Sequence, residues 1–269
     1  MRSFALDVFV RNTRAFAPKT HYDVSKIIVK HTTRRGTIGW LLIAASILYC
    51  GALTQARAQH YVPFRPDLPV GTKCLIDPAV VHPTQTAVGM REVEMRMERM
   101  KAWSVKKRER FMKEKTAPIV IGPGNEVYLL DHHHLARLLL ESKMLPAMYA
   151  EIKGNYSALS ERDFWAAMKE HKWVYLFDEA GRPLDAPSHL PKRIMDLRDD
   201  PYRSLSWLVR EQNGYREVDA PYLEFEWANF FRSRVTIEPG KEGCERAVPA
   251  ALLVCHSPEA KQLPGYIAR

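Results

Sequence analysis

The sequence predicts an α+β fold in which a small mixed sheet with helices is followed by a helix-rich C-terminal half. Short apolar runs alternate with apolar residues at helical spacing between residues 74 and 178. Two of these runs are separated by Gly-Pro-Gly-Asn at 122–125, which is typical of a hairpin. Beyond residue 190 the apolar pattern is helical.

The first elements follow an extended lead-in. Residues 59–73 contain three prolines and predict a segment that is not packed. Residues 74–85 predict a short strand and a turn. Residues 89–115 contain helix formers and apolar residues at spacings of three and four, so they predict one long amphipathic helix.

The hairpin leads into the next helix. Its second strand is expected to end at Asp131, which would be the N-cap of a helix that runs to about Met144. A strand at 148–152 and a helix capped by Ser160 follow. Residues 174–177 predict a further strand.

The C-terminal half closes the predicted domain. Helices are expected at 199–214 and 225–234. The domain is therefore expected to span 74–235, and 236–269 would be a C-terminal tail.

Residues 1–58 have the order of a secretory signal, with basic residues up to Arg35, an apolar stretch at 38–53 and small residues ending at Ala58. The sixteen apolar residues would span about 24 Å as a helix, less than the roughly 30 Å of bilayer hydrocarbon. We therefore expect cleavage near Ala58, a periplasmic or secreted protein, and no stable membrane span afterwards. The alternative is an uncleaved N-terminal anchor with the domain facing outward.

Most of the formal net charge of +9 lies in this leader. Residues 1–58 contain nine Lys and Arg and two Asp, which leaves a net charge of only +2 for residues 59–269. A nearly neutral domain gains little from counterion release on DNA unless its basic residues cluster on one face. The charge therefore favours a small ligand over long DNA.

Three cysteines follow the leader. An oxidising compartment would allow Cys244 and Cys255 to pair across the ten residues between them. Buried thiols at these positions and at Cys74 are equally compatible with the sequence.

Asp131, His132, His133 and His134 at the expected strand-to-helix junction are the most unusual feature of the chain. A helix N-terminus offers free N–H groups and the positive end of a dipole, which attract phosphate. Histidines there can transfer protons, ligate a metal or hold an anion. Because successive helical positions turn by about 100°, at most two of the three are expected to act together. The alternative is that Asp131 only caps the helix while the histidines are bonded to the core.

Several segments together resemble the bacterial family of ParB-like nucleases. They are Val81-His-Pro-Thr-Gln, Gly89-Met-Arg-Glu-Val-Glu, Pro118-Ile-Val-Ile-Gly-Pro, Tyr128-Leu-Leu-Asp-His-His-His-Leu-Ala-Arg, Phe164-Trp, Asp199-Asp-Pro-Tyr-Arg-Ser-Leu and Phe225-Glu-Trp-Ala-Asn-Phe-Phe-Arg. The resemblance runs from about Leu75 to Arg234 and implies the ParB/sulfiredoxin fold. Relatives in that superfamily include nucleotide-binding partition proteins, sulfiredoxin and free-serine kinases, and a Gly-x-x-Arg-type turn holds phosphate.

The chain departs from the superfamily pattern at two positions. Free-serine kinases have Asp-Gly-His-His-Arg where this chain has His132 in place of the glycine and Leu135 in place of the arginine, with Arg137 half a turn on. A kinase would also lack ATP outside the cytoplasmic membrane. The resemblance therefore favours hydrolysis or binding over phosphotransfer.

The predicted function is that of a ParB-like nuclease or phosphoester hydrolase, whose partner is a phosphate-containing ligand or nucleic acid. The expected catalytic residues are Asp131, His133, His134 and Glu92, with a histidine as general base. The expected phosphate-binding residues are Arg91, His132 and Arg137. A divalent metal stays open as cofactor, because Glu92 could bind one. The alternatives are a non-enzymatic nucleotide or phospho-ligand binding module and a phosphotransferase like the serine kinases.

Overall fold

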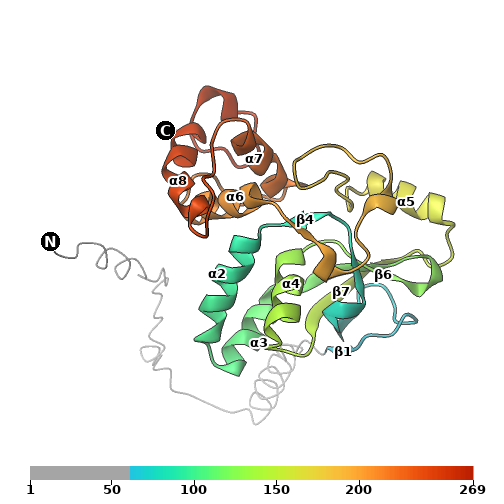
Figure 1. Cartoon of the computed structure of the whole chain (residues 1–269). Helices are drawn as coiled ribbons and strands as arrows, with labels where there is room; N and C mark the ends of the chain where they lie inside the picture. Colours follow the sequence, from blue (N-terminus) through green and yellow to red (C-terminus); the bar gives the residue numbers. More distant parts are fainter. Residues whose placement is uncertain (1–60, 269) are drawn as a thin grey trace, which may run out of the picture. The chain divides into compact units, whose positions relative to one another are not determined.

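A six-stranded mixed sheet lies at the centre of the N-terminal half of the protein (Figure 1). The computed structural model describes residues 61–268, so the leader and its predicted cleavage lie outside the described residues. In spatial order the strands are β1 (Val62–Pro63), β2 (Lys73–Ile76), β7 (Met148–Asn155), β5 (Ala117–Ile121), β6 (Val127–Leu129) and β3 (Val81–Pro83). The pairs β2/β7 and β5/β6 are antiparallel, whereas β1/β2, β5/β7 and β3/β6 are parallel.

Helices cover both faces of this sheet because its central strands are apolar on both sides. Ile119 and Ile121 of β5 belong to the same core as buried residues of α2 (Met90–Lys101), α3 (Val105–Glu114) and α4 (His133–Ser142). Val120, which points the opposite way, packs with Phe164 of α5 (Glu161–Glu170). The predicted sheet with helices is thus confirmed.

The C-terminal half is a helical unit with its own core. Helices α6 (Pro201–Glu211), α7 (Leu223–Arg232) and α8 (Gly243–Val254) pack around Trp207 and Trp227 (Figure 1). The two halves meet where α2 packs against both α4 and α6. A short parallel pair, β4 (Ala87–Val88) with β8 (Arg198–Asp199), lies beside this junction.

Several expected elements are confirmed, whereas the prediction of one long helix at 89–115 is wrong. The hairpin forms as β5 and β6 around the 3-10 turn Pro123–Asn125, and Ser160 caps α5 by accepting from the Asp163 amide. The expected helix at 89–115 is two helices, because Ser104 leaves the helical conformation and caps α3 by accepting from the Lys107 amide. Periodicity alone does not show such a break, since the apolar spacing continues across it.

Three further expectations are corrected. The lead-in at 59–73 is packed in part, because it contains β1 and because Val62 and Phe64 lie against the sheet core. Residues 174–177 form only an isolated bridge between Phe177 and Pro183 rather than a strand. The tail at 236–269 contains α8, whose Ala247, Val248 and Ala251 are buried in the helical core.

The cysteines are buried thiols. Cys244 and Cys255, which both lie in the described part of the chain, form no disulfide with each other. Burial raises the pKa of the Cys74 and Cys244 thiols to about 11, so both stay protonated at neutral pH.

Between residues 61 and 268, no helix combines the length and apolar character needed to cross a bilayer.

The start of α2 is held by hydrogen bonds to side chains of β8 and α6. The backbone amides of Met90 and Glu92 donate to Asp199 Oδ1 at 2.9 Å and to Ser204 Oγ at 3.2 Å. A Cβ atom on Gly89 would lie 2.6 Å from the Ser204 backbone nitrogen, which is closer than real Cβ atoms approach. Only glycine therefore fits at this crossing of the two helices.

We expect Gly89→Ala to lower the free energy of unfolding by about 2–3 kcal/mol, because the methyl group must push α2 and α6 apart. Gly71→Ala is the matched control. A methyl group there meets no atom within 4 Å, and only its positive φ opposes alanine, at about 1 kcal/mol. Urea unfolding of both variants measures the difference, and an equal loss in both would contradict the close approach.

Candidate functional site

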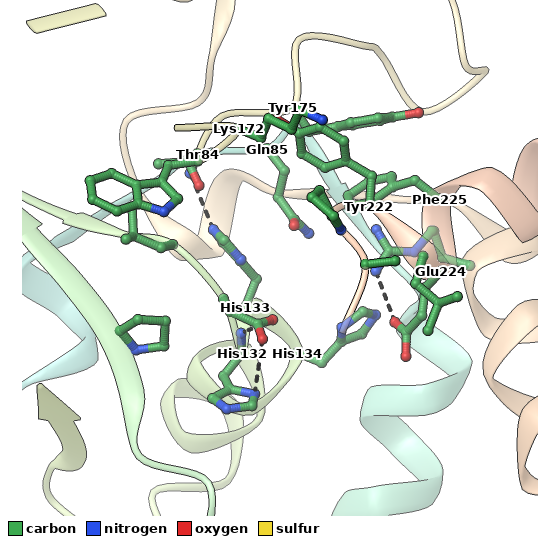
Figure 2. A pocket seen from close by; sticks show the side chains of 18 of the residues that line it. Thr84, Gln85, His132, His133, His134, Lys172, Tyr175, Tyr222, Glu224 and Phe225 are labelled. Carbon is green, nitrogen blue, oxygen red and sulfur yellow. Dashed lines mark hydrogen bonds and ion pairs between the residues drawn. The ribbon is translucent and has the colours of Figure 1, made fainter. Parts of the chain in front are cut away.

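A cavity of about 810 Å³ lies where β6, α4, the start of α2, α6 and the segment before α7 come together. Figure 2 shows the histidine triplet on one side of it and Tyr222, Glu224 and Phe225 on another. The predicted residues Glu92, Asp131, His132, His133 and His134 all line this cavity. The structure thus brings together five of the seven predicted site residues.

The junction before α4 differs from the expected cap. The N-cap residue is His132 rather than Asp131, and no side chain caps α4 within the described structure. Asp131 instead accepts a 2.6 Å hydrogen bond from the His132 amide. His132 has a positive φ of 65°, a conformation that favours glycine.

His133 is buried and is bonded to the segment that follows β3. Its Nε2 accepts a 3.1 Å hydrogen bond from the Thr84 backbone amide, which places the ring proton on Nδ1. Burial, together with the charge of Arg203, lowers the pKa of His133 to about 3 against the opposing charge of Asp131. His133 is therefore neutral, and its one basic nitrogen is already occupied.

His134 has the same arrangement one residue later. Its Nε2 accepts a 2.9 Å hydrogen bond from the Gly89 backbone amide. Burial and the nearby charges of Arg203 and Arg96 hold its pKa well below the ordinary value. The structure thus gives neither His133 nor His134 a free lone pair on Nε2 for a general base.

Glu92 is the titratable carboxyl at the bottom of the cavity. Its Oε1 accepts a 2.6 Å hydrogen bond from Arg96, whereas its buried Oε2 has no hydrogen-bond partner among the described residues. Burial raises the pKa of Glu92 to about 7, with Arg96 opposing and Glu224 adding to the rise. The Oε2 atom also lies 3.3 Å from His134 Nε2, and two acceptors at this distance favour a protonated carboxyl.

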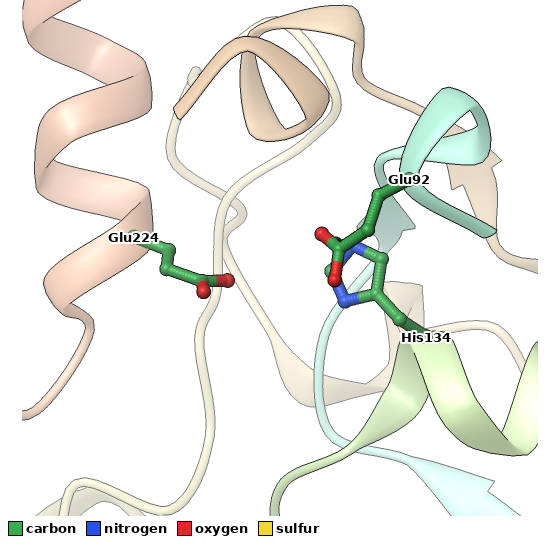
Figure 3. Close-up of side chains that lie close together, drawn as sticks. All are labelled: Glu92, His134 and Glu224. Atoms are coloured by element: carbon green, nitrogen blue, oxygen red, sulfur yellow. Dashed lines mark ion pairs between the residues drawn. The ribbon is translucent and has the colours of Figure 1, made fainter. Parts of the chain in front are cut away.

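Glu224 reaches the cavity from α7, opposite Glu92 and His134 (Figure 3). Its Oε2 accepts from Arg203 at 3.1 Å, and its Oε1 pairs with Arg210 at 2.6 Å. Both arginines come from α6.

Arg203 is the most buried cation of the site. Its side chain is 5% exposed and stacks on the Phe225 ring with its guanidinium carbon 3.6 Å from the ring centroid. Its Nε and Nη1 atoms are buried with no hydrogen-bond partner in residues 61–268. A buried donor without a partner is costly, so a ligand with acceptor oxygens would satisfy this group.

Aromatic rings form one wall of the cavity. Tyr175 and Phe225 stack with centroids 3.7 Å apart, and both line the cavity with Tyr222. The Tyr222 hydroxyl donates to the Val174 carbonyl oxygen at 2.7 Å, which fixes the segment that precedes α7.

A metal fits this donor set poorly. Glu92, His134 and Glu224 each offer an atom within 4.8 Å of the others, which is a suitable spacing for one cation. However, His134 Nε2 already accepts from Gly89, and both Glu224 oxygens accept from arginines. Three arginine charges around two carboxylates favour an anion over a divalent cation.

Arg91 and Arg137 lie elsewhere. Arg91 pairs with Glu94 at 3.0 Å and also with Glu245, whereas Arg137 pairs with Glu141 at 2.6 Å and donates to the carbonyl oxygen of Leu197. Neither side chain lines the cavity, so the structure does not bring these two arginines to the histidine triplet.

The cations that line the cavity were not selected from the sequence. They are Arg96, Lys115, Lys153, Lys172, Arg203 and Arg210. The sequence contained a signal for two of them. Arg203 lies four residues before the buried Trp207 and Arg210 three residues after it, so both lie on the same face of the expected helix as Trp207. A charge on an apolar helix face needs a partner, and here that partner is Glu224.

Comparisons with known proteins give the family. The family model described as "Putative ParB-like nuclease" matches residues 75–233. The crystal structure of protein Atu1540 from Agrobacterium tumefaciens is 32% identical with a TM-score of 0.64, and the match covers 73% of this chain and 98% of that chain. No curated protein matches the sequence. The family model covers more than half of the chain, and the chain therefore belongs to the ParB-like nuclease family.

Proposed function

We propose that this cavity binds a phosphate group and hydrolyses a phosphoester bond. The observation that carries the proposal is the presence, in one cavity, of a buried arginine with unpartnered nitrogens and a buried carboxyl with a pKa of about 7. Perturbed titratable groups in a cavity favour a catalytic role.

The charges of the cavity support an anionic ligand. Six Lys and Arg side chains line the cavity against five carboxylates, and Glu92 loses its charge when protonated. The uncapped N-terminus of α4 adds the positive end of a helix dipole. Phosphate oxygens would accept hydrogen bonds from the arginine side chains and from the free backbone amides at the start of α4.

Glu92 is the residue best suited to move a proton. In its ionised form Oε2 is free to accept a proton from a water molecule, whose oxygen attacks phosphorus. The phosphorus–oxygen ester bond then breaks, the leaving oxygen takes a proton from solvent, and Glu92 returns its proton to solvent. Arg203 and Arg210 stabilise the charge that develops on the phosphoryl oxygens.

The histidines position this machinery. His133 and His134 hold the backbone amides of Thr84 and Gly89, and Gly89 immediately precedes the helix that carries Glu92. We therefore assign proton transfer to Glu92 and treat the two histidines as positioning residues.

We expect Glu92→Gln to reduce hydrolysis of a generic phosphodiester such as bis(p-nitrophenyl) phosphate by about 100-fold or more, because the amide cannot accept the proton. Glu94→Gln is the matched control, since Glu94 is two residues away, 43% exposed and outside the cavity. Rates are measured with EDTA and with added divalent cations. Equal rates in the two variants would remove Glu92 from the mechanism, and binding of phosphate without turnover would indicate a binding module.

The rate is expected to rise with pH through about 7 and then level off, because Glu92 must lose its proton to act as a base. Steady-state rates between pH 5 and 9 give this profile. A rate that falls as the pH rises through this range would contradict a general-base role. A profile with no change near neutral pH would contradict the raised pKa.

The contribution of His133 to stability is expected to fall as the pH drops below about 6.5, because the unfolded chain protonates His133 readily and the folded chain does not. His133 contributes at most about 1.4 kcal/mol per pH unit to this slope. His133→Gln, which keeps an acceptor for Thr84, should flatten it, with the exposed His189→Gln as control. Urea unfolding at several pH values tests this, and equal slopes in wild type and His133→Gln would contradict it.

A further inference from the structure

We propose that α3 carries a docking surface for the phosphate backbone of a nucleic acid strand, which it leads into the cavity. This surface, called the α3 basic surface, consists of Lys106, Lys107, Arg110 and Lys113. The inference rests on the proposed function and makes its substrate a polymer rather than a small phosphate ester.

The first step is the distribution of charge. Residues 101–115 contain seven Lys and Arg and two Glu, a net charge of +5. Residues 59–269 together carry +2, so all other residues of the domain carry −3. The domain is therefore polarised rather than uniformly neutral, and its excess of positive charge is concentrated on and around one helix.

The second step is the geometry of α3. Lys106, Arg110 and Lys113 are spaced at four and three residues, so they share one face of the helix, with Lys107 beside them. All four are exposed. The opposite face anchors α3, because Met112 is buried in the sheet core on the same side of the sheet as α2 and α4 (Figure 1).

The third step is the lack of neutralising partners. Within residues 61–268, the only ion pair of these four residues joins Arg110 to Glu114 at 3.8 Å. Lys107 and Lys113 lie over the rings of Trp103 and Tyr149, which leaves their ammonium protons available to acceptors. By contrast, Arg91 and Arg96 on α2 both pair with glutamates on their own helix.

The fourth step is continuity with the cavity. Lys115 follows the last residue of α3 and lines the cavity, as do Lys153 and Lys172. The nine residues from Lys106 to Lys115 correspond to about 13 Å at 1.5 Å per helical residue. This length is several times the axial rise of about 3.4 Å per phosphate of one duplex strand, so the surface is long enough to contact more than one phosphate. A small phosphate ester would need only the cavity.

A nucleic acid fits this surface better than an anionic membrane. An interfacial helix inserts an apolar face into lipid. The apolar residues Phe111 and Met112 of α3 are instead packed on the sheet core, and only Val105 is exposed. The surface therefore offers charge without an insertable apolar face.

The test compares two variants with the same change in charge. One is Lys106→Ala, Lys107→Ala, Arg110→Ala and Lys113→Ala, and the control is Lys143→Ala, Lys192→Ala, Lys241→Ala and Lys261→Ala, at exposed lysines elsewhere. Fluorescence anisotropy with a labelled single-stranded oligonucleotide measures affinity across salt concentrations. We expect the α3 variant to reduce the slope of log affinity against log salt by about 3, and the control to retain most of it.

Hydrolysis of bis(p-nitrophenyl) phosphate separates this inference from the proposed function. The α3 variant should lose oligonucleotide binding and retain turnover of the small ester, which also shows that it is folded. Lys106→Gln with Arg110→Gln is a milder second variant. It should reduce the slope of log affinity against log salt by about half as much as the fourfold variant does. Equal losses in the α3 variant and the control, or tighter binding to vesicles of anionic phospholipid than to the oligonucleotide, would overturn the docking surface. Failure of Glu92→Gln to reduce turnover would instead overturn the proposed mechanism.

Discussion

Two hydrogen bonds from backbone amides to histidine rings determine the shape of the site. Thr84 and Gly89 donate to the Nε2 atoms of His133 and His134, and these bonds fix the segment at 84–89 against the first turn of α4. Because that segment leads directly into α2, the same bonds set the position of Glu92. A buried amide that lost its acceptor would destabilise this region by about 1–3 kcal/mol, so consecutive histidines at this junction have a structural explanation.

The electrostatics of the cavity follow from this arrangement. Arg96 pairs with Glu92 on its own helix, whereas Arg203 and Arg210 of α6 pair with Glu224 of α7. Attraction between such groups is strong only because the surrounding protein excludes water. The same exclusion keeps both histidines neutral and makes Glu92 the group that titrates near neutral pH.

The sequence predicted the sheet and the hairpin well, because apolar periodicity and turn residues report local structure directly. It did not predict the break at Ser104, which is a capping event inside a continuous apolar pattern. It identified the cluster at 131–134 but not Arg203, Arg210 or Glu224, which lie about 70 to 90 residues further along the chain and reach the cavity only through the packing of α6 and α7. The arginines chosen instead, Arg91 and Arg137, were near the cluster in sequence yet had acidic neighbours within one helical turn.

The packing of α8 on α6 means that the segment matched by the family model is shorter than the folded unit. The family model ends at residue 233, ten residues before α8 begins. Yet α8 supplies Val248 and Ala251 to the core that supports Trp207, the residue between the two cavity arginines of α6. A chain shortened to end at residue 233 would lose α8 and expose the apolar face of α6 that packs on it, so an expression boundary belongs beyond α8.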